Sequence, residues 1–225
     1  MAKEIMQKEI KEESMEFVFD NKELFKEYQT MIQQYQAGIK EVRTKLEILD
    51  DEFNIRYNHN PIHHMEYRLK SPDSIKKKLD AKNLSFSTEN ISNNLYDIAG
   101  IRVICNYVKD IYRISKLLTK QDDVTVIEKK DYIKNPKPNG YASLHLVIEV
   151  PIFLSDRTKT IPVEVQIRTI AMDFWASLEH QLRYKNQNEL PSDIKERLVE
   201  CARKIYDLDE QMEEIHTILK GNHQI

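Results

Sequence analysis

The stretch Pro162-Val163-Glu164-Val165-Gln166-Ile167-Arg168-Thr169 alternates apolar and polar side chains from Val163 to Arg168. Successive side chains of a β-strand point to opposite faces of a sheet, so this alternation predicts a strand over residues 161–167. One of its faces carries Glu164, Gln166 and Arg168, which are a carboxylate, an amide and a guanidinium. Such a face is either exposed to solvent or a binding surface, and on this stretch alone exposure is the simpler interpretation.

The flanking sequence predicts the rest of a compact sheet with helices. Runs rich in Val and Ile predict three more strands, at residues 98–107, 124–129 and 144–150. Helices are expected at residues 72–81 (with Ser71 as N-cap), 110–119 and 168–184. The helix over residues 168–184 is expected to turn five apolar side chains inward: Ile170, Phe174, Trp175, Leu178 and Leu182. These elements indicate an α/β (α+β) fold with a mixed β-sheet of about five strands.

Two heptad patterns flank these elements and predict long helices. The first ends before Pro61 and steps by four and three residues through Tyr28, Ile32, Tyr35, Ile39, Val42, Leu46, Leu49 and Phe53. The second has the same steps through Ile194, Leu198, Cys201, Ile205, Leu208, Met212, Ile215 and Leu219. Seams of this length fit intramolecular core packing or subunit assembly better than binding of a partner helix. We expect a polar segment at residues 1–20 and one domain at 21–225, with its core at about 59–185.

The composition limits the class of protein. The 225 residues carry a net charge of −3, 40% of them are hydrophobic, and only 2 are cysteines. No apolar run approaches the roughly 18 residues of a membrane span, and the charged N-terminus lacks an apolar signal-peptide core. Cys105 and Cys201 have neither the number nor the spacing of a disulfide framework or a zinc site. A reduced cytoplasmic protein without a membrane partner is therefore expected.

The basic residues cluster locally although the net charge is close to zero. Six of them fall between Arg68 and Lys82, and four between Lys129 and Lys137. A protein that binds a long nucleic acid is usually clearly basic, so two local clusters fit a small polyanion better. Obligatory binding to nucleic acid is not expected.

Two carboxylates and one loop add chemistry to this charge pattern. Asp97 begins an apolar stretch that contains Arg102, and an arginine there is costly unless it is paired or bound to a ligand. Asp97 and Glu164, on separate strands, can share Mg²⁺, which prefers oxygen ligands and substrate phosphates. The loop at residues 131–145 holds Tyr141 where its ring can stack on a base, although an ordinary loop tyrosine is equally consistent. Taken together, the parts indicate phosphoryl-type transfer.

Four ordered motifs resemble the synthetase domain of the RelA/SpoT-type alarmone synthetases. The motifs are Arg68-x-Lys70 with Ser74 and Lys78, D-I-A-G-I-R at 97–102, N-G-Y-A-S-L-H at 139–145, and E-V-Q-I-R-T at 164–169 followed by A-M-D-F-W-A-S-L-E-H at 171–180. The similarity covers about residues 59–185, and the flanking helices resemble the small, stand-alone members. The resemblance implies a nucleotidyltransferase-like sheet flanked by long N- and C-terminal helices.

The resemblance implies a reaction and residues for the donor nucleotide. Pyrophosphate would move from ATP to the 3′-hydroxyl of GDP or GTP, giving AMP and ppGpp or pppGpp, the alarmones of the stringent response. Glu164 would act as the general base and would hold Mg²⁺ together with Asp97. Arg68 and Arg102 would sandwich the adenine. The ATP phosphates would be held by Lys70, Ser74 and Lys78.

The resemblance also implies an acceptor site and an assembly. Tyr141 would stack on guanine, and Asp173 would read the edge of that base. The ribose and phosphates of the acceptor would be oriented by Lys130, Lys137, His145, Gln166 and Arg168. The assembly would be a homotetramer.

Some features set limits on this interpretation. Ala142 stands where short members commonly have arginine, so no guanidinium at this position contacts the acceptor, and the preference between GDP and GTP stays open. No His-Asp dipeptide occurs in the sequence, so the hydrolase activity of longer members is not expected. His59, His63 and His64 fit a surface turn better than a metal site. Two alternatives are a nucleotidyltransferase-like enzyme that modifies RNA ends and a non-enzymatic coiled-coil interaction protein.

Overall fold

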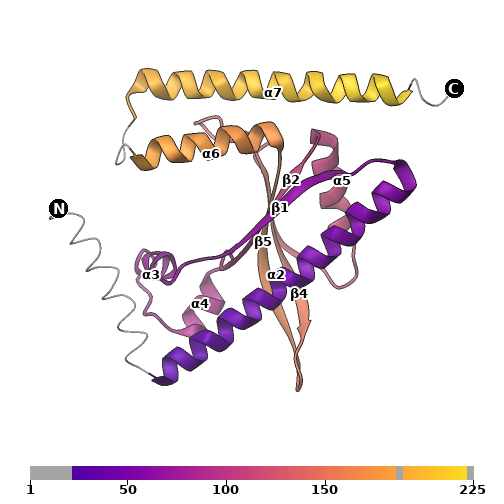
Figure 1. Ribbon diagram of the computed structural model, residues 1–225. Coiled ribbons are helices and arrows are strands. Elements are labelled where there is room, and N and C mark those ends of the chain that lie inside the picture. The colour runs from indigo at the N-terminus through magenta and orange to yellow at the C-terminus, as the bar shows by residue number, and fades with distance from the viewer. Residues whose placement is uncertain (1–21, 186–189, 222–225) are drawn as a thin grey trace. The chain divides into compact units, whose positions relative to one another are not determined.

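The computed structural model describes residues 22–185 and 190–221, so the segment expected at residues 1–20 lies outside the described residues. Five strands form one sheet in the order β1-β2-β5-β4-β3. The strands are β1 (Ile62–Leu69), β2 (Ala99–Cys105), β3 (Thr125–Asp131), β4 (Leu144–Phe153) and β5 (Thr158–Thr169). The helices are α2 (Lys22–Tyr57), α3 (Pro72–Asp80), α4 (Thr88–Asn94), α5 (Val108–Leu118), α6 (Ile170–Lys185) and α7 (Ser192–Gly221) (Figure 1).

The sheet is mixed, and its edge strand β1 was not predicted. Lys70 N donates to Ile98 O at 2.9 Å and Asn106 N donates to Pro61 O at 3.1 Å, so β1 and β2 run antiparallel. The predicted fold class, a mixed sheet of about five strands between long helices, is confirmed. Strand β1 escaped prediction because Ile-His-His-Met-Glu-Tyr-Arg-Leu lacks an apolar face, with only Ile62 buried. The short helix α4 was missed as well.

The described chain forms two compact units. Unit 1 contains residues 22–43, 67–101 and 149–164, and unit 2 contains residues 44–66, 102–148, 165–185 and 190–221. Helix α2 and four strands, β1, β2, β4 and β5, contribute residues to both units. The single domain over residues 21–225 therefore stays a prediction, and each unit is described by itself.

The heptad seam of α2 is buried core. In unit 1, Tyr35 and Ile39 are buried, and a Cβ added to Gly38 would lie 2.8 Å from Ile161 Cγ2. Helix and strand therefore pack so closely at this point that only glycine fits without a shift. In unit 2, Leu46 is fully buried, and the Arg113 guanidinium lies 4.6 Å from the centre of the buried Phe53 ring. Both parts of the seam thus pack inside their own unit.

The apolar face of α6 is exposed, which corrects a prediction. Four side chains expected to point inward are between 42% and 61% exposed: Ile170, Phe174, Leu178 and Leu182. Trp175 alone of the predicted set is buried, together with Met172, Ala176 and Glu179. Helix α7 lies along α6 within unit 2 (Figure 1) and leaves Leu208, Met212, Ile215 and Leu219 about half exposed. Periodicity locates an apolar stripe but does not say what covers it.

Candidate active site

Unit 1 holds a cluster of two lysines on one carboxylate, the lysine–aspartate cluster. Lys70 Nζ lies 2.8 Å and Lys78 Nζ 2.5 Å from the same oxygen, Asp97 Oδ2. The bond from Lys70 N to Ile98 O brings Lys70 beside Asp97 at the end of the β1–β2 pair. Lys78 comes from α3, which Ser71 caps and Pro72 begins, as the sequence predicted. Three predicted residues therefore come together.

The carboxylate of this cluster is held in its ionised form. Burial by itself raises the pKa of Asp97, but the hydrogen bonds and charges of Lys70 and Lys78 outweigh it and hold the pKa below its usual value. Two ammonium groups against one carboxylate leave a net positive charge. The cluster thus offers cations to an anionic ligand and one oxygen ligand to a metal ion.

The other predicted residues of unit 1 lie on α3, β1 and β5. Ser74 stands in the first turn of α3, where its Oγ accepts a hydrogen bond from Ser71 Oγ at 2.9 Å. The exposed Arg68 crosses Gly100, whose added Cβ would lie 3.8 Å from Arg68 Cγ. Glu164 is half-buried on β5 between two fully buried valines. No described contact tests the adenine sandwich of Arg68 and Arg102, which stays a prediction.

Unit 2 holds the loop tyrosine within a ring of polar groups. Tyr141 Oη and His145 Nε2 are 2.8 Å apart, and Lys137 Nζ lies 4.9 Å from the centre of the Tyr141 ring. The Arg168 guanidinium lies 5.9 Å from that ring. Tyr132, which sequence reasoning did not assign, packs edge-on against His145 at 5.2 Å between ring centres. The tyrosine thus belongs to a cluster of predicted residues, unlike an ordinary loop tyrosine.

The turn before Tyr141 is fixed by the backbone. Gly140 N donates to Lys137 O at 2.8 Å, and Lys137 N donates to Tyr141 O at 3.0 Å. Gly140 has a φ of 90°, a conformation that side-chain-bearing residues rarely adopt. Asn139 Oδ1 accepts from Tyr141 N at 3.2 Å. The Asn-Gly pair therefore sets the position of the tyrosine ring.

Two arginines and one aspartate complete the second cluster, which we call the tyrosine–arginine cluster (Tyr141, His145, Arg168, Asp173 and Arg102). Asp173 Oδ1 lies 3.4 Å from Arg168 Nη1 and 3.8 Å from Arg102 Nη1. Arg102 Nη1 also donates to Glu66 Oε2 at 2.9 Å, a partner that sequence reasoning missed because β1 was not recognised. Within the described residues, three buried atoms lack a hydrogen-bond partner: Arg102 Nε, Arg168 Nε and Asp173 Oδ1.

Burial settles the character of the polar face of β5. Arg168 is 3% exposed, and burial lowers the pKa of its guanidinium. Its Nη2 lies 3.4 Å from Gln166 Oε1 on the same face. A buried guanidinium with an unpartnered Nε is costly unless a ligand completes its hydrogen bonds. The face is therefore buried at this end, as a binding surface requires, although the simpler interpretation of its sequence alone was exposure.

The histidine of the tyrosine–arginine cluster is neutral. Burial, followed by the positive charges of Lys137, Arg168 and Lys130, lowers the pKa of His145 to about 4. Lys130 itself pairs with Glu128 at 2.8 Å on β3. Lys130 therefore acts on His145 through the electrostatic effect of its charge. The other predicted acceptor residues are in contact with one another.

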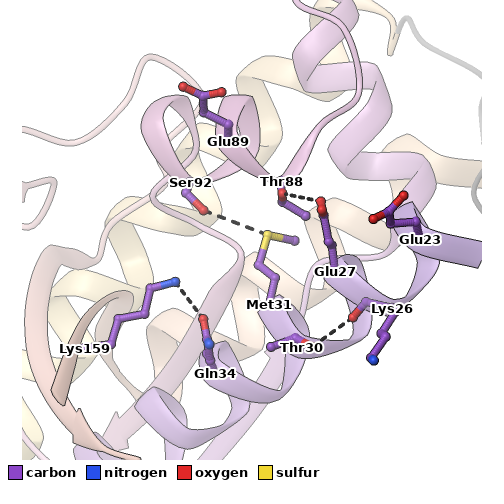
Figure 2. A pocket seen from close by; sticks show the side chains of 10 residues that line it. All are labelled: Glu23, Lys26, Glu27, Thr30, Met31, Gln34, Thr88, Glu89, Ser92 and Lys159. Atoms are coloured by element: carbon purple, nitrogen blue, oxygen red, sulfur yellow. Dashed lines mark hydrogen bonds between the residues drawn. The ribbon is translucent and has the colours of Figure 1, made fainter. Parts of the chain in front are cut away.

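Other grooves and histidines carry none of the predicted site residues. A groove of about 520 Å³ in unit 1 is lined by Glu23, Lys26, Glu27, Thr30, Met31, Gln34, Thr88, Glu89, Ser92 and Lys159 (Figure 2). Its polar groups bond to one another, as Lys159 Nζ does to Gln34 Oε1 at 2.7 Å. His63 and His64 lie together on exposed β1, and no group of three or more His, Cys, Asp or Glu in the described ranges could hold a metal. The described helices include none that could cross a membrane.

Comparison with known proteins decides the family. Residues 67–189, more than half of the chain, match the family model described as the region found in RelA/SpoT proteins. The chain is 42% identical over 193 residues to the GTP pyrophosphokinase YwaC of Bacillus subtilis, covering 86% of this chain and 92% of YwaC. The chain belongs to the RelA/SpoT alarmone synthetase family. The GTP pyrophosphokinase YjbM of Bacillus subtilis is 35% identical over 84% of this chain and 89% of its own length.

Solved structures of the family agree with the fold. Small alarmone synthetase 2 from Bacillus subtilis superposes with a TM-score of 0.77 at 41% identity, over 84% of this chain and 98% of that one. Small alarmone synthetase 1 from the same organism, solved with its product pppGpp, has a TM-score of 0.77 at 34% identity, over 89% and 100% of the two chains. This alarmone synthetase is thus of the small type and is a GTP pyrophosphokinase. The alternatives of an RNA-end enzyme and a non-enzymatic coiled-coil protein are therefore wrong.

Proposed function

We propose that this GTP pyrophosphokinase transfers the β,γ-pyrophosphate group of ATP to the 3′-hydroxyl of GDP or GTP, giving AMP and ppGpp or pppGpp. The observation that carries the proposal is that two buried atoms beside the Tyr141 ring, Arg168 Nε and Asp173 Oδ1, have no hydrogen-bond partner among the described residues. A guanine nucleotide supplies a flat base for the ring and polar groups for those atoms. Relatives support both substrates, since small alarmone synthetase 1 was solved with AMPCPP and with pppGpp.

The donor nucleotide is assigned to the lysine–aspartate cluster. Lys70 and Lys78 are compact ammonium groups already gathered on one carboxylate, and they neutralise the ATP phosphates when these replace part of that contact. Ser74 adds a hydroxyl in the first turn of the capped helix α3. For the adenine we carry over Arg68 and Arg102 from the family resemblance, since the guanidinium plane is delocalised and weakly hydrated.

Asp97 and Glu164 are the proposed ligands of Mg²⁺, and the residues present fit that ion. Asp97 is ionised and already in contact with positive charge, and Glu164 adds a second, half-buried carboxylate. Mg²⁺ is commonly bound by one or two carboxylates together with substrate phosphates, so a third protein ligand is not needed. When bound, the ion would neutralise negative charge that develops on the transferred pyrophosphate and on the leaving AMP.

The acceptor nucleotide is assigned to the tyrosine–arginine cluster apart from Arg102. Tyr141 stacks on guanine, and Asp173 Oδ1 accepts hydrogen bonds from the N–H groups on the edge of the base. Arg168 and Lys137 bind acceptor phosphates. Ribose and phosphate contacts are completed by His145, Gln166 and Lys130.

Glu164 is the proposed general base. It accepts the proton of the 3′-hydroxyl while the 3′-oxygen forms a bond to the β-phosphorus of ATP. The bond between that phosphorus and the oxygen that bridges to the α-phosphorus breaks, and the bridging oxygen leaves with AMP. Lysines and arginines placed in advance stabilise the developing negative charge without rearranging.

We propose a homotetramer as the assembly. The support is the exposed apolar stripe of α7, which nothing in unit 2 covers among the described residues. Exposed stripes of this kind mark protein interfaces. The double variant Leu208→Glu, Met212→Glu should lower the mass measured by light scattering, whereas Glu210→Gln on the same helix should not. An unchanged mass in the double variant would contradict this interface.

Product analysis tests the proposed reaction. Wild-type protein incubated with Mg²⁺, ATP and GDP should produce AMP and ppGpp in equal amounts. A nucleotidyl transfer would instead release pyrophosphate and yield no AMP. That result, or ATP consumption that does not depend on GDP, would overturn the proposal.

A further inference from the structure

One buried hydroxyl connects α7 to the acceptor site. Thr169, at the end of β5, is fully buried and donates from Oγ1 to Asp209 Oδ2 at 2.5 Å. The same Oγ1 accepts a hydrogen bond from Met172 N at 3.1 Å and so caps α6. Thr169 follows Arg168 directly, and the α6 turn that it caps carries Asp173. Asp209 thus holds the junction between two residues assigned to the acceptor.

A second contact lies beneath the loop that holds Tyr141. A Cβ added to Gly140 would lie 2.6 Å from Ala202 Cβ, so α7 packs directly against this turn. Ala142 lines a small apolar void with Ala202 and Trp175, which explains how alanine is accommodated at this position. Trp175 Nε1 donates to Leu198 O at 3.0 Å and ties α6 to α7 at the same level.

The face of α7 that packs within unit 2 combines apolar side chains, such as Leu198 and Ile205, with small and polar ones. Ala202, Asp209 and Glu213 are spaced by seven and four residues, which places them on one side of the helix. Glu213 extends the attachment, since its Oε1 pairs with Lys109 Nζ at 2.7 Å. Asp209 and Glu213 make specific polar bonds to other parts of unit 2, and the exposed apolar stripe lies on another side of the helix. The packed face therefore fixes the position of its neighbours in addition to covering apolar surface.

We infer that α7 is a positioning element of the acceptor site, in which Thr169, Asp209 and Ala202 hold Arg168, Asp173 and Tyr141 in the geometry that binds GDP or GTP. The inference rests on the proposed function. None of the three positioning residues is among those assigned to the nucleotide. A displacement of about 1 Å at a binding group can lower the rate or affinity about 10²-fold. The hydrogen bond of Thr169, which is adjacent to Arg168 in sequence, can therefore affect binding of the acceptor strongly.

Steady-state kinetics of two threonine variants tests the inference. Thr169→Val keeps the shape and removes the hydroxyl, so the KM for GDP should rise by at least about tenfold while the KM for ATP stays within about twofold. Thr169→Ser restores the hydroxyl and should return the KM for GDP to within about threefold of wild type. A KM for GDP that does not change in Thr169→Val, or that Thr169→Ser fails to restore, would overturn the inference.

A bulky substitution on α7 gives an independent measurement. Ala202→Leu should push the turn at Gly140 and raise the KM for GDP selectively, whereas Cys201→Leu, at the exposed neighbouring position, should not. Thermal unfolding checks that each variant is folded. If Thr169→Val does not fold, the comparison of Ala202→Leu with Cys201→Leu tests the inference in its place. If both KM values rise together in Ala202→Leu, the inference is wrong. A wild-type protein that forms no AMP and ppGpp contradicts the proposed reaction instead.

Discussion

The lysine–aspartate cluster of unit 1 and the tyrosine–arginine cluster of unit 2 both hold cations against an aspartate. They differ in how far the polar groups are satisfied by contacts within the protein. In the first, one carboxylate oxygen contacts two ammonium groups. In the second, the ion pairs to Asp173 are 3.4 and 3.8 Å long, and three buried atoms have no hydrogen-bond partner among the described residues. Lysine offers a mobile point charge, whereas arginine offers a planar fork of fixed geometry. The difference fits the proposed assignment of the ATP phosphates to the lysines and of the guanine base to Tyr141 and Asp173.

The largest effect is expected at Glu164, the proposed general base, which belongs to neither cluster. Glu164→Gln removes the proton acceptor, so kcat should fall about 10²- to 10⁴-fold with little change in either KM. Steady-state rates of AMP formation measure this. Glu149→Gln on the neighbouring strand β4 is the control and should keep kcat. Full activity in Glu164→Gln would show that Glu164 is not the general base, although the two binding clusters could still be assigned as proposed.

A smaller and selective effect is expected at Tyr141. Stacking of a base on an aromatic ring contributes about 1–3 kcal/mol, so Tyr141→Ala should raise the KM for GDP about 5- to 150-fold. Tyr141→Phe keeps the stacking surface and should change that KM far less. Tyr57→Ala removes an exposed tyrosine that has no assigned role, and it should leave both KM values unchanged. An equal rise of the ATP and GDP values in Tyr141→Ala would break the division between the clusters.

The smallest effect concerns pH and the neutral state of His145. Its folded pKa of about 4 is below the unfolded value of 6.5, so between these values the unfolded chain binds the extra proton. The contribution of this group to stability is therefore present above pH 6.5 and is lost as the pH falls toward 4, by about 1 kcal/mol between pH 7 and pH 5.5. Thermal unfolding of wild type and His145→Gln over this range measures it. Parallel pH curves for the two proteins would show that His145 is not desolvated as described.

The same contrast shows what the sequence could and could not predict. The alternation of Glu164, Gln166 and Arg168 predicted a polar strand face, and the structure confirms it with Arg168 buried. Glu66, the partner of Arg102, could not be found because it depends on the register of β1, whose polar sequence carries no strand signal. Side chains near in space but distant in sequence need the register before they can be paired.

The helices add a second lesson about pattern and environment. The seams of α2 and α7 have the same spacing, yet Leu46 on α2 is fully buried and Met212 on α7 is about half exposed. The stripe of α6 was assigned to the core for the same reason and is exposed, as at Phe174. A 3.6-residue period identifies the stripe, but its partner is decided by tertiary packing. Contacts of α7 to Thr169 and Gly140 have no sequence signal at all.

Calorimetric titration of each nucleotide into two variants tests the division of labour most directly. GDP and a non-hydrolysable ATP analogue are titrated separately, with Mg²⁺ present, into wild type, Lys78→Met and Tyr141→Ala, with Lys77→Met on the same helix as control. We predict that Lys78→Met weakens the ATP analogue about tenfold and leaves GDP unchanged, while Tyr141→Ala does the reverse. Equal weakening of both nucleotides in either variant, or no weakening in both, would contradict the account.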